Sequence, residues 1–316
     1  MSKINRAQIV IFGLLYGFAT LASAQALTVA GGGGIKQGST YSAILGELAT
    51  ACADDGIQLS EVQTSGGPQN LELLKGNKVA AAIVQTDILF AAKLDNATSV
   101  ANIKTVVALH PEPIHLVVRA DAKTEGGVTV FGKNIGGDTV VFKNAEDLKG
   151  RPVGAVGGSV ISARILGEQL RYGWQITEYA KTTDLLQALS AHKIDAAIIV
   201  AGAPSAAVAQ INGHQFKLLP IRGNSDTAAV YNPAKIQYPN LNAGRAVDTL
   251  SEQALLVTRT WKSDDMLKKL GAVRACFNKQ LPNIQDRQGT HPAWQDMDAT
   301  QQGKWVWYDL PKVAVK

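Results

Sequence analysis

A short pattern occurs twice in this chain, once in each half, and it limits what the chain can fold into. When Lys78 is aligned with Lys193, residues 79–84 (VAAAIV) lie over residues 194–199 (IDAAII). In each copy an amphipathic helix ends in a polar turn, and a nearly all-apolar run follows. A run of this length predicts a strand buried on both faces, as in a parallel sheet covered by helices. The repeat therefore predicts two similar α/β lobes, and clefts between lobes are places where small molecules bind.

The first 24 residues have the pattern of a secretory signal peptide. Lys3 and Arg6 give a positive start, residues 9–22 are apolar and uncharged, and residues 22–24 (ASA) form a small-residue cleavage site. A membrane anchor is the alternative. The apolar stretch is shorter than the roughly 20 residues that a spanning helix needs, so we favour cleavage. The pattern predicts an exported, soluble chain that begins at Gln25 and resides in the periplasm.

The two cysteines, Cys52 and Cys276, fall on the apolar faces of two predicted helices. In an oxidising compartment such a pair can form a disulfide, which would tie a C-terminal helix to the first lobe. Two buried free thiols are the alternative, and we favour the disulfide.

Strands and helices alternate along both halves, with short turns between them, and this order predicts parallel sheets. In the first half we expect strands at 27–30, 57–62, 79–84, 104–109 and 114–119, and helices at 39–53, 68–76 and 86–94. In the second half we expect strands at 153–156, 176–180, 194–200 and 216–219, and helices at 159–172, around 185–189 and at 204–211. Residues 110–113 (HPEP) separate the last two strands of the first half.

The remaining segments connect the lobes. Residues 121–143 predict a hairpin-like insertion with a loose tip at 136–138, or else a flexible loop. Residues 222–247 predict a return connection, followed by a strand at 254–258, a helix from Ser263 and an irregular tail over the first lobe. We expect a signal peptide (1–24), the first part of lobe 1 (25–120), lobe 2 (121–222) and a segment that completes lobe 1 (223–316). Because the chain crosses between the lobes twice, they can close like a hinge.

The common catalytic and binding motifs are absent from the sequence. The first glycine-rich turn matches neither a P-loop nor a G-x-G-x-x-G motif, because Lys36 and Gln37 occupy positions that these motifs reserve for other residues. In the turn at 157–161, Ile161 occupies the position where a nucleophile elbow requires glycine. None of the five histidines has the spacing of a zinc site. No basic stripe interleaved with aromatic residues indicates nucleic-acid binding. We expect no catalytic residue, no metal and no cofactor.

Polar turns remain where strands end and helices begin, at 38–41 (GSTY), 64–67 (TSGG), 85–87 (QTD), 157–159 (GGS) and 201–203 (AGA). Open α/β sheets bind ligands outside the carboxyl ends of their strands. Helix N-termini offer free N–H groups and partial positive charge, which suit a carboxylate or a phosphate. Turns of this kind in both lobes predict one binding site between the lobes.

At these residues the chain resembles the TAXI-type solute-binding proteins, the extracytoplasmic receptors of TRAP transporters. The resemblance runs from about Leu27 to the tail, and its marks are SGGPQNLELL (65–74), AIVQTD (82–87), LHPEPIHLVVR (109–119), DLKGRPVG (147–154) and AAIIVAGAP (196–204). It implies an α/β, two-lobe periplasmic-binding-protein type II fold, each lobe a mainly parallel sheet flanked by helices. It also implies delivery of a small, often carboxylate-bearing solute to a membrane permease driven by an ion gradient. The glycine-rich first turn and the long insertion depart from the family pattern, and they leave the identity of the solute open.

We therefore expect a monomeric receptor whose lobes close around a small solute, such as an amino acid or an organic acid, and then dock on TRAP permease subunits. The expected ligand-binding residues come from both lobes: Ser39, Thr40, Tyr41, Ser65, Gly66, Gly67, Gln85, Thr86, Asp87, His110, Glu112, Gly158, Ser159, Gly202 and Ala203. Asp87 has an equally good alternative as the cap of its helix. The whole chain has two alternatives: an exported enzyme with His110 and Glu112 as acid–base residues, and a ligand-binding sensor subunit.

Overall fold

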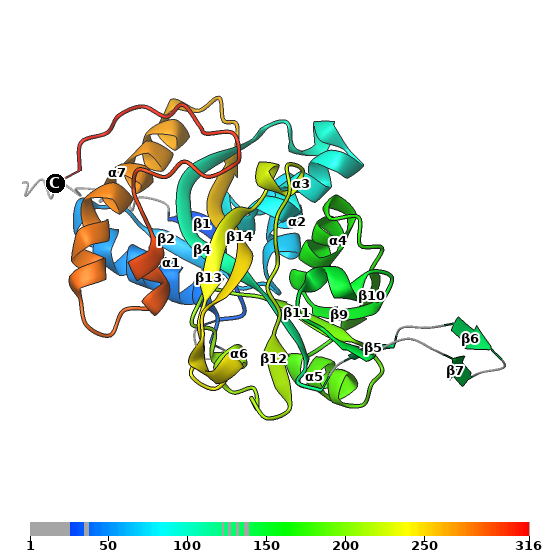
Figure 1. Ribbon diagram of the computed structural model, residues 1–316. Coiled ribbons are helices and arrows are strands. Elements are labelled where there is room, and N and C mark those ends of the chain that lie inside the picture. Colours follow the sequence, from blue (N-terminus) through cyan, green and yellow to red (C-terminus); the bar gives the residue numbers. More distant parts are fainter. Residues whose placement is uncertain are drawn as a thin grey trace, which may run out of the picture.

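The computed structural model describes residues 26–34, 38–121, 123–125, 128–130, 133–135 and 139–315. The predicted signal peptide, together with Lys36 and Gln37 of the glycine-rich turn, lies outside these residues. Figure 1 shows two α/β halves side by side, with strands β4 and β14 running between them.

The first half, lobe 1, places helices on both sides of a short parallel sheet. Its elements are β1 (Leu27–Ala30), α1 (Thr40–Cys52), β2 (Leu59–Val62), α2 (Gly67–Lys75), β3 (Ala81–Gln85), α3 (Thr86–Asp95) and the C-terminal helix α7 (Asp264–Asp286). Strand β1 pairs in parallel with both β2 and β3. Every residue of β3 is buried, as the apolar run predicts for a strand covered on both faces.

The second half, lobe 2, repeats this order. Its elements are β9 (Pro152–Val156), α4 (Ser159–Gln169), β10 (Gln175–Tyr179), α5 (Thr182–Ser190), β11 (Ala196–Val200), α6 (Ala206–Ala209) and β12 (Phe216–Leu218). Strand β9 pairs in parallel with β10 and β11. Helix α6 is shorter than the predicted helix at 204–211. The helix starts only after Ser205, whose N–H donates to Tyr238 Oη at 2.8 Å.

The repeat found in the sequence is also a repeat of backbone conformation. Asn77 and His192, which precede the two aligned lysines, both adopt the left-handed conformation, with φ of 57° and 58°. The N–H of Lys78 donates to Leu73 O, and the N–H of Lys193 donates to Ala188 O in the same way. Each copy thus ends its helix with the same reversal and enters a buried strand beside a parallel partner.

Two long strands cross from one lobe to the other and join the strands of both lobes into one ten-stranded sheet. Eight of its strands follow the order β10-β9-β11-β4-β14-β3-β1-β2, and β12 and β13 pair with β4 and β14 beside this path. They are β4 (Ile103–Arg119) and β14 (Val247–Arg259). Strand β4 pairs with β14 along most of its length and with β11 near its end, while β14 pairs with β3 and with β13 (Asn232–Ile236). All of these pairs are antiparallel, so the expectation of parallel sheets is wrong for the two crossing strands. Strand β12 adds to the same sheet by pairing with β4. These crossings form the two connections that the sequence predicts for a hinge.

The predicted break at residues 110–113 is wrong, because β4 continues through them. Pro111 and Pro113 lie opposite Gln253 and Ser251 of β14. The carbonyl of Pro113 accepts from Ala201 N–H, so the prolines turn their nitrogens toward the β11 side, away from β14. No bond to β14 requires an N–H at either residue, and the strand tolerates both prolines.

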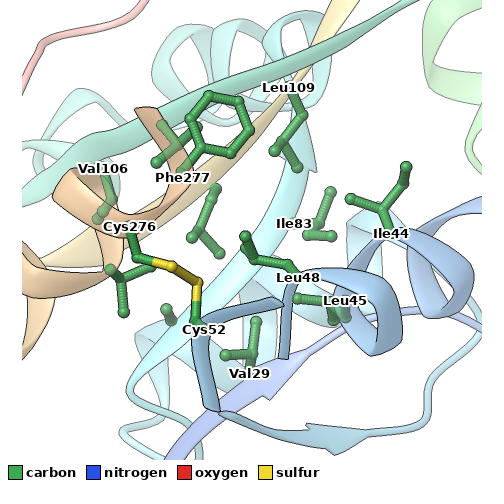
Figure 2. Close-up of a cluster of buried hydrophobic side chains, with 14 of the residues drawn as sticks. Val29, Ile44, Leu45, Leu48, Cys52, Ile83, Val106, Leu109, Cys276 and Phe277 are labelled. Carbon is green, nitrogen blue, oxygen red and sulfur yellow. A yellow bond between two sulfur atoms is a disulfide. The ribbon is translucent and has the colours of Figure 1, made fainter. Parts of the chain in front are cut away.

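The main core of lobe 1 packs α1 and α7 against the sheet around a disulfide. Cys52 of α1 and Cys276 of α7 are bonded, with their Cα atoms 5.9 Å apart, which confirms the predicted pairing. Figure 2 shows the pair among buried side chains that include Val29, Leu48 and Phe277. The tail after α7 adds Trp294, which is fully buried, so it packs on lobe 1 as expected.

The insertion is built from hairpins in the residues that the structure describes. Strand β5 (Lys123–Glu125) pairs with β8 (Thr139–Val141), and β6 (Val128–Val130) pairs with β7 (Lys133–Ile135). The predicted tip at 136–138 lies outside the described residues. Figure 1 shows β6 and β7 extending away from lobe 2. Among the described helices, none combines the length and the apolar character needed to cross a bilayer.

Candidate functional site

Glu112 is the centre of a buried polar cluster at the point where β4 crosses between the lobes. Its carboxylate accepts from Tyr41 Oη of α1 at 3.2 Å and from Gln85 Nε2 at the end of β3 at 2.9 Å. His110 Nε2 lies 3.1 Å from the other carboxylate oxygen. Four predicted site residues from three elements of the fold therefore meet at one carboxylate.

Lobe 2 faces this cluster with two of its predicted glycine turns. A Cβ at Gly158, in the turn after β9, would lie 3.5 Å from Gln85 Nε2. A Cβ at Gly202, in the turn after β11, would lie 3.4 Å from the imidazole of His110. The polar corners of the two lobes thus point toward each other, with the lobes close together.

Several buried polar atoms of the cluster have no hydrogen-bond partner among the described residues. They are Gln85 Oε1, His110 Nδ1 and Asp87 Oδ1. Gln85 Oε1 lies in the gap between the lobes, 2.1 Å from where a Cβ on Gly67 would be and 3.8 Å from one on Gly158. Because an unpartnered buried polar group costs about 1–3 kcal/mol, atoms of this kind between two lobes indicate a place for a polar ligand.

Asp87 and Glu252 extend the cluster toward the second hinge strand, and both are fully buried. Burial raises the pKa of Asp87, although hydrogen bonds from Ser162 and from its own turn act against that rise. Burial raises the pKa of Glu252 well above its ordinary value, and the neighbouring Asp87 carboxylate adds to the effect. Glu252 therefore resists ionisation more strongly than Asp87, whose anionic form is stabilised by hydrogen bonds.

The glycine turn of lobe 1 is held in place by two polar side chains, the buried Asn70 and the half-buried Glu61. Asn70 Nδ2 donates to Gly31 O and to Ile83 O, both at 2.7 Å, which joins the ends of β1 and β3. Glu61 accepts from the N–H of Gly32 at 3.1 Å and from the hydroxyl of Ser42. A Cβ on Gly31 would lie 2.2 Å from the Glu61 carboxylate, so only glycine fits there. This network fixes the start of α1, from which Tyr41 reaches Glu112.

The turns of lobe 2 are held by uncharged groups. Ser159 Oγ accepts from Val200 N–H at 3.0 Å and so joins the turn after β9 to the end of β11. His115 lies between Ile199 O, at 3.1 Å from Nδ1, and Tyr238 Oη, at 2.7 Å from Nε2. Tyr238 Oη in turn accepts from Ser205 N–H. Burial lowers the pKa of His115 to about 4, so this imidazole is neutral at ordinary pH.

Other predicted site residues make contacts of their own. Ser65 is exposed and bonds Gln69, and the neighbouring Gly66 is half-buried. Ser39 caps α1 by accepting from Ser42 N–H, and Thr40 Oγ1 lies 3.4 Å from His291 Nε2. Thr86 Oγ1 accepts from Gln253 N–H at 3.2 Å, and Ala203 is half-buried beside Gly202. A role for any of these residues in binding stays a prediction.

The sequence prediction missed three residues beside Asp87: Glu252 of β14, Tyr231 of the return connection and Ser162 of α4. Tyr231 Oη donates to Asp87 Oδ2 at 3.4 Å. The predicted strand at 254–258 began after Glu252, whereas β14 begins at Val247. A charged residue within an apolar strand is a signal for a buried polar site, and it was available for Glu252.

The structure also contains cavities beside this cluster. Cavities of 760 Å³ and 410 Å³ share Lys304; the larger is lined mainly by the return connection, and the smaller by α3, the segment after it and the tail. A cavity of 260 Å³ lies between α2, α3 and α4. Of the predicted site residues, Thr86 alone lines one of these three cavities. The candidate site is therefore identified by the polar groups that face each other across the two lobes and not by a cavity. The Gln85 side chain fills the gap between the lobes there. No group of three or more metal-ligating side chains is found in the described part of the chain.

Comparison with known proteins gives the family and the fold. The sequence pattern of the NMT1-like family matches residues 33–304. An amino acid ABC transporter substrate-binding protein from Streptococcus pneumoniae, solved with L-arginine, is 14% identical with a TM-score of 0.50, over 86% of this chain and 94% of that one. A ligand-binding component of an ABC-type import system from Staphylococcus aureus is 17% identical with a TM-score of 0.47, over 90% of this chain and 86% of that one. The chain thus belongs to the NMT1-like family and has the two-lobed fold of the type II periplasmic binding proteins.

Proposed function

We propose that this protein is an exported receptor that captures a small organic solute between its lobes without changing it chemically. The observation that carries the proposal is the convergence at Glu112. Tyr41, Gln85 and His110 meet there, and Gly158 and Gly202 of lobe 2 face the last two of them. Since polar atoms of Gln85 and His110 lack partners, a solute between the lobes would supply the missing hydrogen bonds.

The groups around the site favour a solute with both a carboxylate and an amino group. The N-termini of α1, α2 and α4 lie beside the cluster, at Tyr41, Gly67 and Gly158, and offer N–H donors to a carboxylate. Glu112 offers a buried acceptor, which repels a carboxylate and favours an ammonium group. An amino acid satisfies both requirements. The similar protein solved with L-arginine and named for amino acid transport supports this class of solute.

We further propose delivery of the solute to a TRAP-type permease in the periplasm by a monomer of this protein. The TAXI-like marks at residues 65–74, 82–87 and 109–119 support this finer assignment. This proposal includes the predicted organisation of the chain: a signal peptide at 1–24, lobe 1 at 25–120 and 223–316, and lobe 2 at 121–222. Co-purification of the tagged receptor with permease subunits after crosslinking in solute-containing medium would test the assignment. An ABC permease in their place would contradict it.

A thermal-shift screen of amino acids and organic acids tests the receptor function. A solute at about 1,000 times its dissociation constant should stabilise the folded protein by about 4 kcal/mol. The Ser60→Ala variant, at an exposed position of β2 outside the predicted site, serves as a control and should respond as the wild type does. If no small solute raises the melting temperature of the purified chain, the proposal fails.

A hydrolase or isomerase on the same scaffold is the second candidate, because His110 and Glu112 form a buried pair at 3.1 Å. Such a pair can move a proton. Recovery of a bound solute in altered chemical form, with loss of the conversion in His110→Ala, would establish the enzyme. Unchanged solute after long incubation supports the receptor.

A further inference from the structure

The carboxyl groups of Asp87 and Glu252 make a contact that solute capture does not explain. Glu252 lies on β14 directly opposite Glu112 of β4, and the next residue, Gln253, donates its N–H to Thr86 Oγ1 at the start of α3. This arrangement brings the Glu252 side chain within hydrogen-bonding reach of Asp87, in the first turn of α3. Neither side chain has exposed surface.

Two carboxylates can share a hydrogen bond only if one of them carries a proton. Asp87 already accepts from Tyr231 Oη at 3.4 Å and from the hydroxyl of Ser162. By contrast, Glu252 Oε1 and Oε2 have no donor among the described residues. Hydrogen-bond donors stabilise the anionic form of a carboxyl group, so Asp87 ionises more readily than Glu252. The shared proton therefore belongs to Glu252, which donates it in a hydrogen bond to Asp87.

The surrounding titratable groups favour this protonated state. Glu112 of β4 and Asp87 of α3 act on Glu252 as negative charges, and both raise its pKa in addition to the effect of burial. Tyr41 of α1 and Tyr231 of the return connection are neutral, because burial and the nearby carboxylates raise the pKa of each phenol well above its ordinary value. His110 lies on the far side of Glu112, at 3.1 Å from it.

Lobe 2 completes the enclosure of this pair. Ser162 belongs to α4, which lies beside α3 in Figure 1 and packs against it. Opening of the lobes would withdraw Ser162 and admit water to the carboxyl groups. Since water lowers the cost of ionising a carboxyl group, the pair would hold its proton less tightly in the open form.

We propose that the closed form binds one proton between Glu252 and Asp87 and that opening of the lobes releases it. This inference rests on the proposed function, since it requires lobes that open and close around a solute. A solute that stabilises the closed form then binds together with a proton. Its affinity falls by up to about tenfold per pH unit as the pH rises from about 4.3, the ordinary pKa of glutamate, to the higher pKa of the closed form.

The direct test follows the side-chain carboxyl resonance of Glu252 by NMR in the full exported chain with 13C-labelled glutamate, without added solute. The resonance is assigned by its loss in Glu252→Gln, and the pH is varied from about 4 to about 9. We expect the midpoint of Glu252 to lie well above its ordinary value. A midpoint near the ordinary value of about 4.3 overturns the inference. This measurement needs no ligand, so it can fail while the thermal-shift screen succeeds, and the reverse also holds.

Two variants test the cause and the coupling. Asp87→Asn removes the neighbouring negative charge and should lower the midpoint of Glu252 by at least about one unit. Gly158→Trp should wedge the lobes apart and lower the midpoint as well, with opening verified by small-angle X-ray scattering; Gly202→Trp replaces it if the first variant stays closed. An opened variant whose Glu252 keeps the wild-type midpoint disproves the coupling between the proton and closure.

Discussion

The corner at the end of β3 and the corner at the end of β11 share a backbone pattern but carry different chemistry. Both strands follow the same helix reversal, at Asn77 and at His192. The first corner leads directly into α3 with Gln85 and Asp87, beside Glu112 and Glu252 of the hinge strands. The second leads into an uncharged turn, 201–203, supported by the neutral His115.

This difference indicates a division of roles between the lobes. In the proposed receptor, lobe 1 and the hinge strands supply the side chains that bind the solute, while lobe 2 supplies the glycine turns that face them. The lobes also differ in how they are stabilised. The chain's two cysteines are bonded within lobe 1, whereas lobe 2 depends on packing and on hydrogen bonds, including those of the Arg119 guanidinium to Leu189 O and Ile194 O. The five predictions below test these contrasts.

Removal of the disulfide should produce the largest effect and should be confined to lobe 1. In Cys52→Ala/Cys276→Ala we expect a loss of about 2–5 kcal/mol in unfolding free energy, because the bond closes a long loop, with a sequence separation of 224. Urea unfolding measures the loss, and hydrogen exchange should show it in α1 and α7 but not in α5. Reduced wild type should match the variant. Equal loss of protection in both lobes would contradict the division.

Acid should weaken lobe 2 through His115. Burial holds this imidazole neutral in the folded state, with a pKa of about 4, whereas the unfolded chain takes up the proton below about 6.5. The stabilisation is complete above about pH 6.5 and is lost as the pH falls toward 4, by about 3 kcal/mol in total. The difference in urea stability between wild type and His115→Gln should shrink across this window. A constant difference would mean that His115 is not held neutral.

Substitution at the centre of lobe 1 should weaken solute binding more than any change in lobe 2. Glu112→Gln keeps the shape of the side chain but loses its charge, and hydrogen bonds to a charged group contribute about 1.5–3 kcal/mol. We expect solute affinity to fall by about 10- to 100-fold in isothermal titration calorimetry. The control variant Ser60→Ala, on the exposed face of β2, should change the affinity less than about twofold. Unchanged affinity in Glu112→Gln would place the solute elsewhere.

Two glycine substitutions should separate stability from binding. A Cβ on Gly154 of β9 would lie 2.5 Å from Leu185 and 2.6 Å from Ile194, so Gly154→Ala should lower the stability of lobe 2 by about 1–3 kcal/mol. A Cβ on Gly202 would instead be in ordinary contact, 3.4 Å from the imidazole of His110. Gly202→Ala should therefore weaken binding with little effect on urea unfolding. Unchanged affinity would place the solute away from His110.

The smallest effect is expected at Ser159. Ser159→Ala leaves Val200 N–H without its acceptor and should cost about 1 kcal/mol of stability. Solute affinity should change by less than in Glu112→Gln, because Ser159 serves the turn of lobe 2. A loss of affinity as large as that of Glu112→Gln, measured by the same calorimetry, would show direct contact with the solute.

The sequence predicted much of this architecture because apolar runs and turn residues act locally. The repeat around Lys78 and Lys193, the parallel pairing of β1 with β3 and of β9 with β11, and the pairing of Cys52 with Cys276 are confirmed. The two prolines in residues 110–113 led to the wrong prediction of a break in the strand. A strand accepts proline where the proline nitrogen faces away from the paired neighbour, and only the tertiary structure shows which edge of β4 is paired at these residues. Glu252 was missed because its strand was taken to begin two residues later, at Ala254.

The sequence by itself determined the two α/β halves and the polar turns at the ends of their strands, since helix and strand periodicity and glycine placement are local properties of the chain. Only the tertiary structure brought Glu112 opposite Glu252, Asp87 against Glu252, and His110 toward Gly202. These neighbours come from strands and turns far apart in the sequence. Their closeness depends on the pairing of β4 with β14 and on how the lobes meet, and no local pattern specifies either.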